Sequence, residues 1–415
     1  MREYLIVLNY QREVPPFMIS QLKYASRHFK KVYYVTRSLV TDNFSAVQAG
    51  NVELVQAGSA REPFTAVKAI VGGMLHGGLS SYVGALTQGR LDSTFVKSQV
   101  PVEAGAYLLC REASLLITQL GAENCVVLAT WFSTEAWAAV QLKQRFSALK
   151  AVSFAHSFEV QKKKDPQLDL RHIRERHDGL DAIYFISETV LDNYRAEYIS
   201  PLGISDENSS VHYLGSEPGG VGFGPSTDGA FRLLTCSGVL PVKRLALLVD
   251  GLAALDEERA RLLHWTHIGA GPLESEIKKA AMEKLGLLGD VEFRGYMPNN
   301  EVRGYYEQNP CDLFVNVSSM EGLPVSLMEC MCYGVPALAT DVGGSREVVL
   351  DGVSGRLLPE DPTPAEIAAG IKDFMDMPQF EMMTMRAKCC EVWAEKFDVS
   401  KNADSFYSAL CGGNE

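Results

Sequence analysis

The sequence has 415 residues, of which 47% are hydrophobic and 22% are charged, and its formal net charge is −12. This length favours two or three domains, and this composition is typical of a soluble globular protein, which excludes the disordered, collagen-like and coiled-coil classes. The acidic balance makes nucleic acid an unexpected partner.

The charge is unevenly distributed along the chain. Residues 1–225 contain 22 Lys and Arg and 22 Asp and Glu, whereas residues 226–415 contain 17 and 29. Residues 1–100 are locally basic, with 11 cationic and 6 anionic side chains. This asymmetry would allow the first half to face an anionic surface.

The cysteines and the N-terminus predict a cytoplasmic location. Nine cysteines are an odd number, most lie in apolar runs, and none forms a Cys-x-x-Cys pair, which predicts reduced thiols. The N-terminal residues enter a strand-like run directly, so we expect no signal peptide.

The first half alternates strand-like runs with helical patterns. Its rhythm is interrupted by a long, mainly helical insertion at about 60–122. The longest apolar stretch, Ala69 to Leu86, contains five glycines, so a membrane-spanning helix is not expected. An interfacial amphipathic segment and a buried helical pair broken at Gly77-Gly78 are both open. The predicted strands are Tyr4–Asn9, Lys31–Thr36, Cys125–Thr130, Ala151–Ala155 and Ala182–Ile186.

The second half alternates strands and helices more regularly, which predicts βαβ units and a parallel sheet. A Gly- and Pro-rich segment, Gly215–Pro225, is the expected linker between the halves. We therefore predict an α/β fold with domains 1–222 and 223–390, and a C-terminal helix at 391–415 that crosses back to the first domain. The predicted strands are Phe231–Ser237, Leu263–Ile268, Val291–Arg294, Asp312–Val317 and Val335–Thr340, and the predicted helices are 243–255, 272–285, 299–307 and 324–333.

Two such domains predict a cleft between them, and ligands of open parallel sheets bind beyond the carboxyl ends of the strands. The strongest signal there is Glu321 and Glu329 in a segment that leads from a strand into a helix beginning near Pro324. Free backbone N–H groups at the helix N-terminus favour a phosphate, and the two carboxylates could bind hydroxyl groups on either side of a pyrophosphate. The residues expected to surround the phosphate are Gly322, Leu323, Pro324 and Val325. Taken alone, the carboxylates are equally well explained as a helix-dipole partner and a solvated side chain.

Three further loops follow strands of the second half. Lys243 and Arg244 are adjacent cations at a strand-to-helix turn that begins at Gly238, and they suit a diphosphate or, more simply, a solvated pair. Gly269 and Gly271 form a Gly-x-Gly turn that allows close backbone approach, which is weak by itself. Gly295-Tyr296 follows another strand and could cover a flat base.

In this order and spacing, residues 231–360 resemble the retaining glycosyltransferases of family 4, which have the GT-B fold of two Rossmann-like domains with parallel sheets facing across a cleft. Glu321 and Glu329 match the E-x7-E signature of that family. The resemblance implies that Glu329 holds the ribose hydroxyls of a nucleotide sugar, that Glu321 lies beside the donor sugar, and that Lys243 and Arg244 neutralise the pyrophosphate. Many members have an arginine at the position of Gly238.

The first half resembles the family more loosely. His156, followed by Ser157 and Glu159, resembles a His-Gly-x-Asp element in which Ser replaces Gly and Glu replaces Asp. The resemblance implies that His156 contacts the donor sugar near the reacting carbon. The frequent Gly-Gly loop of the family is replaced by Tyr10–Phe17, so acceptor binding there is expected to differ.

These features predict an enzyme of the EC 2.4 class that transfers a sugar from a nucleotide diphosphate sugar, with a UDP-sugar favoured over a GDP-sugar, and retains the anomeric configuration. No Asp-x-Asp motif suits a metal-held pyrophosphate, so we expect no metal ion and no other cofactor. The expected acceptor is a hydroxyl of a glycan or a lipid-linked glycan in bacterial cell-surface polysaccharide synthesis.

Membrane contact and two other functions remain open at this stage. The basic N-terminal region, the apolar insertion and the run Gln161–Lys164 could bring the chain to the inner face of an anionic membrane, although the lysines equally suit a solvated loop. A nucleotide-sugar 2-epimerase would have the same two-domain layout. A non-catalytic sugar-nucleotide-binding partner subunit is disfavoured by the intact site residues.

Overall fold

The computed structural model describes residues 1–11, 14–37, 50–58, 63–73, 93–160, 166–286 and 289–412. The chain divides into two compact units, residues 1–214 together with 400–415, and residues 215–399. The boundary therefore lies at Gly215, not at the predicted position 222. Backbone hydrogen bonds join Ser216 to Phe397 and Val399, so the start of the linker belongs to the second unit.

The first unit is a seven-stranded parallel sheet of order β3-β2-β1-β4-β5-β6-β7. Its central strands are almost wholly buried, which explains why their sequences are apolar on both faces. The strands are β1 (Tyr4–Asn9), β2 (Lys31–Thr36), β3 (Val52–Gln56), β4 (Cys125–Ala129), β5 (Lys150–Ala155), β6 (Ala182–Phe185) and β7 (Ser209–Val211).

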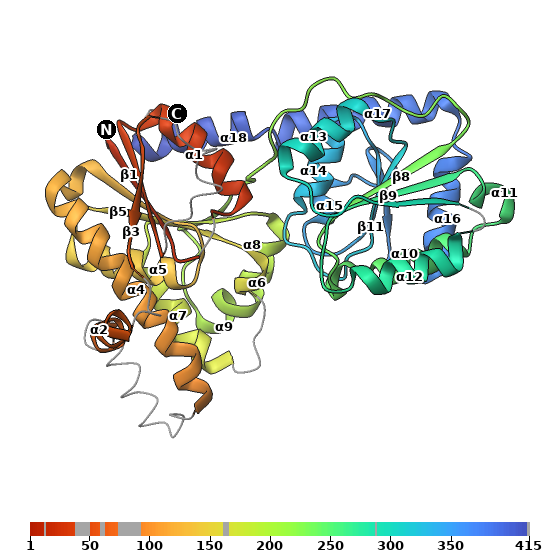
Figure 1. Cartoon of the computed structure of the whole chain (residues 1–415). Helices are drawn as coiled ribbons and strands as arrows, with labels where there is room; N and C mark the ends of the chain where they lie inside the picture. The colour runs from red at the N-terminus through yellow and green to blue at the C-terminus, as the bar shows by residue number, and fades with distance from the viewer. Residues whose placement is uncertain are drawn as a thin grey trace. The chain divides into compact units, whose positions relative to one another are not determined.

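Helices follow most strands of the first unit (Figure 1). The described part of the expected insertion is helical, in α2 and α4, whereas the break at Gly77-Gly78 and the lysines of Gln161–Lys164 lie outside the described residues. The helices are α1 (Pro16–His28), α2 (Pro63–Gly73), α4 (Ser93–Leu120), α5 (Thr134–Arg145), α6 (Ser157–Val160), α7 (Pro166–Gly179), α8 (Glu188–Tyr194), α9 (Ser200–Leu202) and α18 (Val399–Cys411).

The C-terminal helix α18 completes the first unit. His212 and Phe406 stack at 4.4 Å between ring centroids, and the Asn402 amide donates a hydrogen bond to the Tyr213 carbonyl oxygen at 3.0 Å. The preceding helix, α17 (Gln379–Lys396), packs on the second unit instead. The return to the first unit therefore begins near residue 400 and not at the predicted residue 391.

The second unit is a six-stranded parallel sheet of order β10-β9-β8-β11-β12-β13. In Figure 1, α10 (Leu245–Ala253) and α12 (Glu274–Leu285) lie on one side of this sheet, and α13 (Asn299–Gln308), α14 (Val325–Cys332) and α17 lie on the other. The strands are β8 (Phe231–Cys236), β9 (Leu263–Ile268), β10 (Asp290–Phe293), β11 (Leu313–Asn316), β12 (Ala337–Thr340) and β13 (Gly355–Leu358), and the other helices are α11 (Glu257–Ala260), α15 (Ser345–Val348) and α16 (Pro364–Met375).

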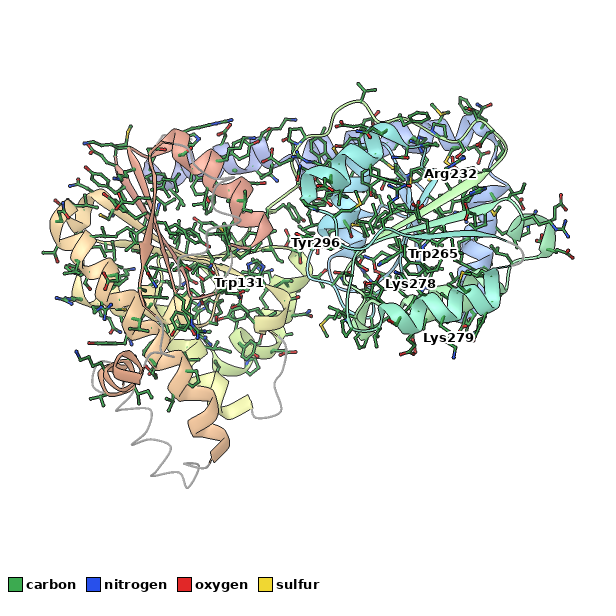
Figure 2. All side chains as sticks on the ribbon, viewed as in Figure 1. Trp131, Arg232, Trp265, Lys278, Lys279 and Tyr296 are labelled. Carbon is green, nitrogen blue, oxygen red and sulfur yellow. The ribbon has the colours of Figure 1, made fainter. Side chains whose placement is uncertain are left out.

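The core of the second unit contains Trp265, which is 1% exposed and appears inside the sheet layer in Figure 2. Its indole N–H donates to the Thr235 hydroxyl at 3.0 Å, so the buried polar group is satisfied. Every predicted strand is present with small shifts at its ends. The sequence reading missed β3, β7 and β13, which are short or partly exposed strands at or near the edges of the sheets.

Two further predictions concern side chains and the membrane. All nine cysteines are free thiols, and five of them are buried. Within the described ranges, no helix is long and apolar enough to span a bilayer.

Candidate functional site

Lys243 and Glu321 form an ion pair at the carboxyl edge of the second sheet. The Lys243 ammonium lies 2.7 Å from Glu321 Oε1, and the side chains are 23% and 10% exposed. Lys243 ends a 3₁₀ turn that follows β8, whereas Glu321 lies in the loop after β11. These strands are neighbours, so residues 78 positions apart meet at one edge of the sheet. A partly buried, partly accessible charge pair of this kind suits a polar ligand.

The loop that contains Glu321 is held by its neighbours. The Asn316 amide Nδ2 donates to Glu321 Oε1 at 3.0 Å, and the Gly344 N–H donates to the Gly322 carbonyl oxygen at 2.9 Å. Gly343 has a left-handed φ of 53°, and a Cβ there would lie 1.8 Å from the Glu321 carbonyl oxygen. The loop after β12 therefore supports the Glu321 backbone at a distance that only glycine permits.

The helix α14 begins at Val325, directly after the glutamate loop. The Leu327 and Met328 N–H groups donate to the Pro324 carbonyl oxygen, so the donors left for a ligand are those before them. Leu323 is buried and Val325 is 43% exposed, which places the start of the helix at the surface. The predicted helix N-terminus beside Gly322–Val325 is therefore present, and it would favour an anion.

Glu329 is buried within α14, and the Asn299 amide at the start of α13 donates a hydrogen bond to it. Burial raises the pKa of Glu329, and this hydrogen bond together with the charge of Arg303 opposes the shift. The Glu329 side chain is thus held by a neutral hydrogen-bond donor within the second unit.

The Arg244 guanidinium is engaged by neighbouring loops of the second unit. Its guanidinium donates to the carbonyl oxygens of Val317 and Ser318 at 2.6 and 3.0 Å. It also donates to the Glu360 carbonyl oxygen at 2.8 Å and pairs with Asp361 at 2.9 Å. Most of its donors are therefore used to tie loops together, and the expectation that Arg244 neutralises a diphosphate stays a prediction.

The two glycines after β9 have a packing role. Gly269 has a φ of 141°, and a Cβ there would lie 1.8 Å from the Ser237 carbonyl oxygen. A Cβ at Gly271 would lie 2.4 Å from the Val239 carbonyl oxygen. The close approach predicted at this turn is therefore to the neighbouring loop after β8. Gly238, in that loop, is exposed and leaves room for a side chain.

Tyr296 is exposed over 78% of its surface and follows Gly295, which has a left-handed φ of 69° (Figure 2). It lies beyond the carboxyl end of β10, at one end of the sheet order. An exposed ring fixed at this edge is available to stack on a flat group.

His156 lies at the carboxyl edge of the first sheet. Its Nε2 lies 3.2 Å from the Thr130 carbonyl oxygen, and since a carbonyl can only accept, Nε2 carries the proton and Nδ1 is the acceptor nitrogen. The ring packs against Trp131, which is labelled in Figure 2, with centroids 4.3 Å apart and ring planes inclined at 43°. Burial lowers the pKa of His156 to about 4, so the imidazole is neutral at pH 7.

Two buried carboxyl groups support the His156 region. Glu159 accepts a hydrogen bond from the His156 backbone N–H at 3.0 Å, and burial raises its pKa to about 8. Glu135 accepts from the Tyr10 N–H at 2.8 Å and from the Ser133 hydroxyl at 3.1 Å, and burial raises its pKa to about 7. The sequence reading missed the role of Glu135, although an acidic residue in the first turn of a helix that follows a strand is a recognisable signal.

The chain is similar to glycosyltransferases in parts of its sequence. Residues 225–389, which include Lys243, Glu321 and Glu329, match the sequence model of the family described as glycosyl transferases group 1. The chain is 28% identical over 200 residues to the amylovoran biosynthesis glycosyltransferase AmsK of Erwinia amylovora, covering 46% of this chain and 48% of that protein. It is 32% identical over 127 residues to the putative colanic acid biosynthesis glycosyltransferase WcaL of Salmonella typhimurium, covering 29% and 31%. The chain thus spans about half or less of the length of these curated relatives.

The fold is that of a known class. The structure resembles that of Anabaena HepE in complex with UDP-glucose, with a TM-score of 0.70 and 14% identity, over 99% of this chain and 100% of that chain. The fold is therefore GT-B, as predicted, and most of the second unit matches the glycosyl transferases group 1 model. These matches agree with the expectation of a glycosyltransferase-type enzyme, whereas the predicted cleft between the domains stays a prediction.

Proposed function

We propose that the chain is a retaining glycosyltransferase that moves a sugar from a nucleotide diphosphate sugar to a hydroxyl group of a glycan or lipid-linked acceptor. The observation that carries this proposal is the Lys243–Glu321 pair at the carboxyl edge of the second sheet, within the segment that matches the family. The relatives named for amylovoran and colanic acid synthesis support a role in cell-surface polysaccharide synthesis.

The donor would lie along the edge of the second sheet. Lys243 would donate to the diphosphate, because an ammonium group with one N–H on Glu321 has two more to offer. The N–H groups at the start of α14 would add donors that need no rearrangement, which favours the charge that develops on the leaving group. Glu329 would accept from the ribose hydroxyls, and Tyr296 would cover the base. A UDP-sugar is favoured, since the structural neighbour contains UDP-glucose.

The reaction is proposed to proceed without a covalent glycosyl-enzyme. The bond between the anomeric carbon and the β-phosphate oxygen breaks as the acceptor hydroxyl attacks from the same side, and the departing phosphate takes the hydroxyl proton. Lys243 stabilises the diphosphate that forms, Glu321 orients the sugar ring, and neutral His156 contacts the sugar near the reacting carbon. We propose that no metal ion or other cofactor is required.

The proposed lipid-linked acceptor would lie at a membrane. We propose that the chain acts in the cytoplasm, at the inner face of the plasma membrane, where the basic N-terminal region would contact anionic lipid. Co-sedimentation with anionic vesicles at low salt tests this part, and an absence of binding would remove it.

The donor part is tested by calorimetry in EDTA with UDP-glucose, GDP-mannose and ADP-glucose. We expect one nucleotide to bind, and Lys243→Gln to weaken its affinity at least tenfold, because an ammonium-to-phosphate contact is lost. Lys279→Gln is the control, since Lys279 is 77% exposed on the outer face of α12, as Figure 2 shows.

The chemical part is tested in two separate incubations of the donor, one with membrane extract and one with no acceptor. The anomeric configuration of the product is determined by NMR. Retention that disappears in Glu321→Gln supports the proposal, and inversion contradicts it. An epimerised nucleotide sugar without acceptor would indicate a 2-epimerase, and binding without turnover would indicate a non-catalytic subunit.

A further inference from the structure

Asn316 is the last residue of β11, and its side chain makes two directed hydrogen bonds. Its Oδ1 accepts from the Ser318 backbone N–H at 2.9 Å, and its Nδ2 donates to Glu321 Oε1 at 3.0 Å. A backbone N–H can only donate, so Oδ1 must face Ser318 and the amide N–H₂ must face the carboxylate. The two partners therefore determine which end of the amide is the oxygen and which is the N–H₂ group.

Glu321 Oε1 is shared between two donors of different kinds. Lys243 reaches it at 2.7 Å from the end of a flexible four-carbon stem, whereas Asn316 reaches it from a short side chain on a strand. When a diphosphate attracts Lys243, the ammonium can shift, but the Asn316 amide cannot. Asn316 is thus the contact that would keep Glu321 in place while Lys243 serves the ligand.

The loop that follows Asn316 is held in place by hydrogen bonds at Ser318 and Ser319. The Ser318 carbonyl oxygen accepts from the Thr340 hydroxyl at 2.6 Å and from the Arg244 guanidinium at 3.0 Å. The Ser319 N–H donates to the Val242 carbonyl oxygen at 2.8 Å. Ser318 is 1% exposed, so the two bonds to its carbonyl oxygen lie in a poorly solvated region where they are strong. Asn316 therefore transmits the position of a fixed loop to the glutamate.

We propose that Asn316 is a positioning residue that holds Glu321 Oε1 for the donor sugar independently of Lys243. The proposal rests on the proposed function, because it assigns Asn316 a role in that donor site. Asn316 touches no reacting atom itself and acts only through Glu321.

A purely structural role makes a different prediction. If Asn316 only closed the turn at Ser318, Asn316→Asp would behave like the wild type, since an aspartate keeps the oxygen that accepts from the Ser318 N–H. It replaces only the donor that faces Glu321, and places a carboxylate against a carboxylate. Two such groups cannot both ionise easily, so they would share a proton and bind the donor better at low pH.

The experiment measures UDP-glucose affinity by calorimetry in EDTA from pH 5.5 to 8, together with the melting temperature, for the wild type and for Asn316→Asp. We expect affinity at pH 8 to fall at least tenfold, to recover by pH 5.5, and the melting temperature to stay within about 2 °C of the wild type. An affinity equal to that of the wild type at every pH overturns the proposal, as does a loss that is uniform with pH and accompanied by a lower melting temperature.

A double variant gives a second test. In Asn316→Asp with Glu321→Gln the hydrogen bond can form in reverse, with the Gln amide donating to the Asp. We expect this variant to bind UDP-glucose no more weakly than Glu321→Gln alone, whereas independent residues would multiply their losses. If the wild type binds no nucleotide sugar, the proposed function fails and this proposal fails with it. If the wild type binds and Asn316→Asp matches it at every pH, Asn316 alone is eliminated.

Discussion

The carboxyl edges of the two sheets are built on opposite electrostatic plans. In the first unit, His156, Glu135 and Glu159 are buried, and burial shifts their pKa values to about 4, 7 and 8, which favours the neutral form of each side chain. In the second unit, Lys243 and Glu321 remain a charged pair at an accessible edge. The same parallel topology thus supports a rigid, neutral loop scaffold in one unit and a charged ligand edge in the other. Five substitutions can break or sharpen this contrast.

The largest effect is expected for Gly343→Ala in the second unit. The left-handed φ alone costs about 1 kcal/mol, and the new Cβ would also collide with the Glu321 carbonyl oxygen, so the loop must move. We expect loss of nucleotide-sugar affinity beyond tenfold and a lower melting temperature. The control is Gly352→Ala, which has a similar φ of 72° and no atom near the added Cβ. Equal behaviour of the two variants would show that the loop after β12 does not position Glu321.

Arg244→Ala tests whether this cation is structural. Its guanidinium donates to Val317, Ser318 and Glu360, and removing it leaves these carbonyl oxygens without those partners. We expect a loss of about 1–3 kcal/mol in unfolding free energy, measured by thermal and urea unfolding. Nucleotide affinity should fall less than in Lys243→Gln. A larger loss of affinity with unchanged stability would indicate that Arg244 binds the diphosphate.

Glu159→Gln tests the neutral scaffold of the first unit. The pKa of Glu159 is about 8 in the folded chain against an unperturbed 4.5, so the folded state holds its proton more tightly than the unfolded state. Its contribution to stability is complete below pH 4.5 and is lost as pH rises toward 8, by at most about 1.4 kcal/mol per pH unit. The variant has no such proton, so its melting temperature should gain on that of the wild type from pH 5 to 8.

Glu135→Gln is the matched comparison for that series. Burial raises the pKa of Glu135 to about 7, so its relative gain should level off about one pH unit earlier. A constant difference from the wild type at every pH would mean that the two carboxyl groups are ionised in the folded chain, which would remove the contrast between the two edges.

Tyr296→Ala should have the smallest effect. The ring is exposed and contributes little to the core, so stability should not change measurably. If the ring stacks on a nucleotide base, affinity should fall about three- to tenfold, in line with roughly 1 kcal/mol for a stacked aromatic pair. Tyr296→Phe is the control, since it keeps the ring. An unchanged affinity for Tyr296→Ala would place the base elsewhere.

The sequence anticipated much of the second unit because its signals are local. Most strands there are short and apolar, and several loops after them carry a distinctive residue, so Lys243 and Glu321 could be named from spacing and resemblance. The contacts of Arg244 could not be foreseen, because a Lys-Arg pair does not reveal which carbonyl oxygens lie nearby. Those oxygens belong to Val317 and Glu360, more than 70 positions further along the chain.

The sequence by itself determined the α/β class, the positions of most strands along the chain and the positions of the charged loop residues, since periodicity and turn chemistry act over a few residues. Only the tertiary structure decided which of those residues pair. It brought Asn316 and Lys243 to the same oxygen of Glu321, and it buried Glu135 and Glu159 deeply enough to hold their protons. Hydrogen-bond partners and desolvation depend on contacts between strands distant in sequence, and no local pattern encodes them.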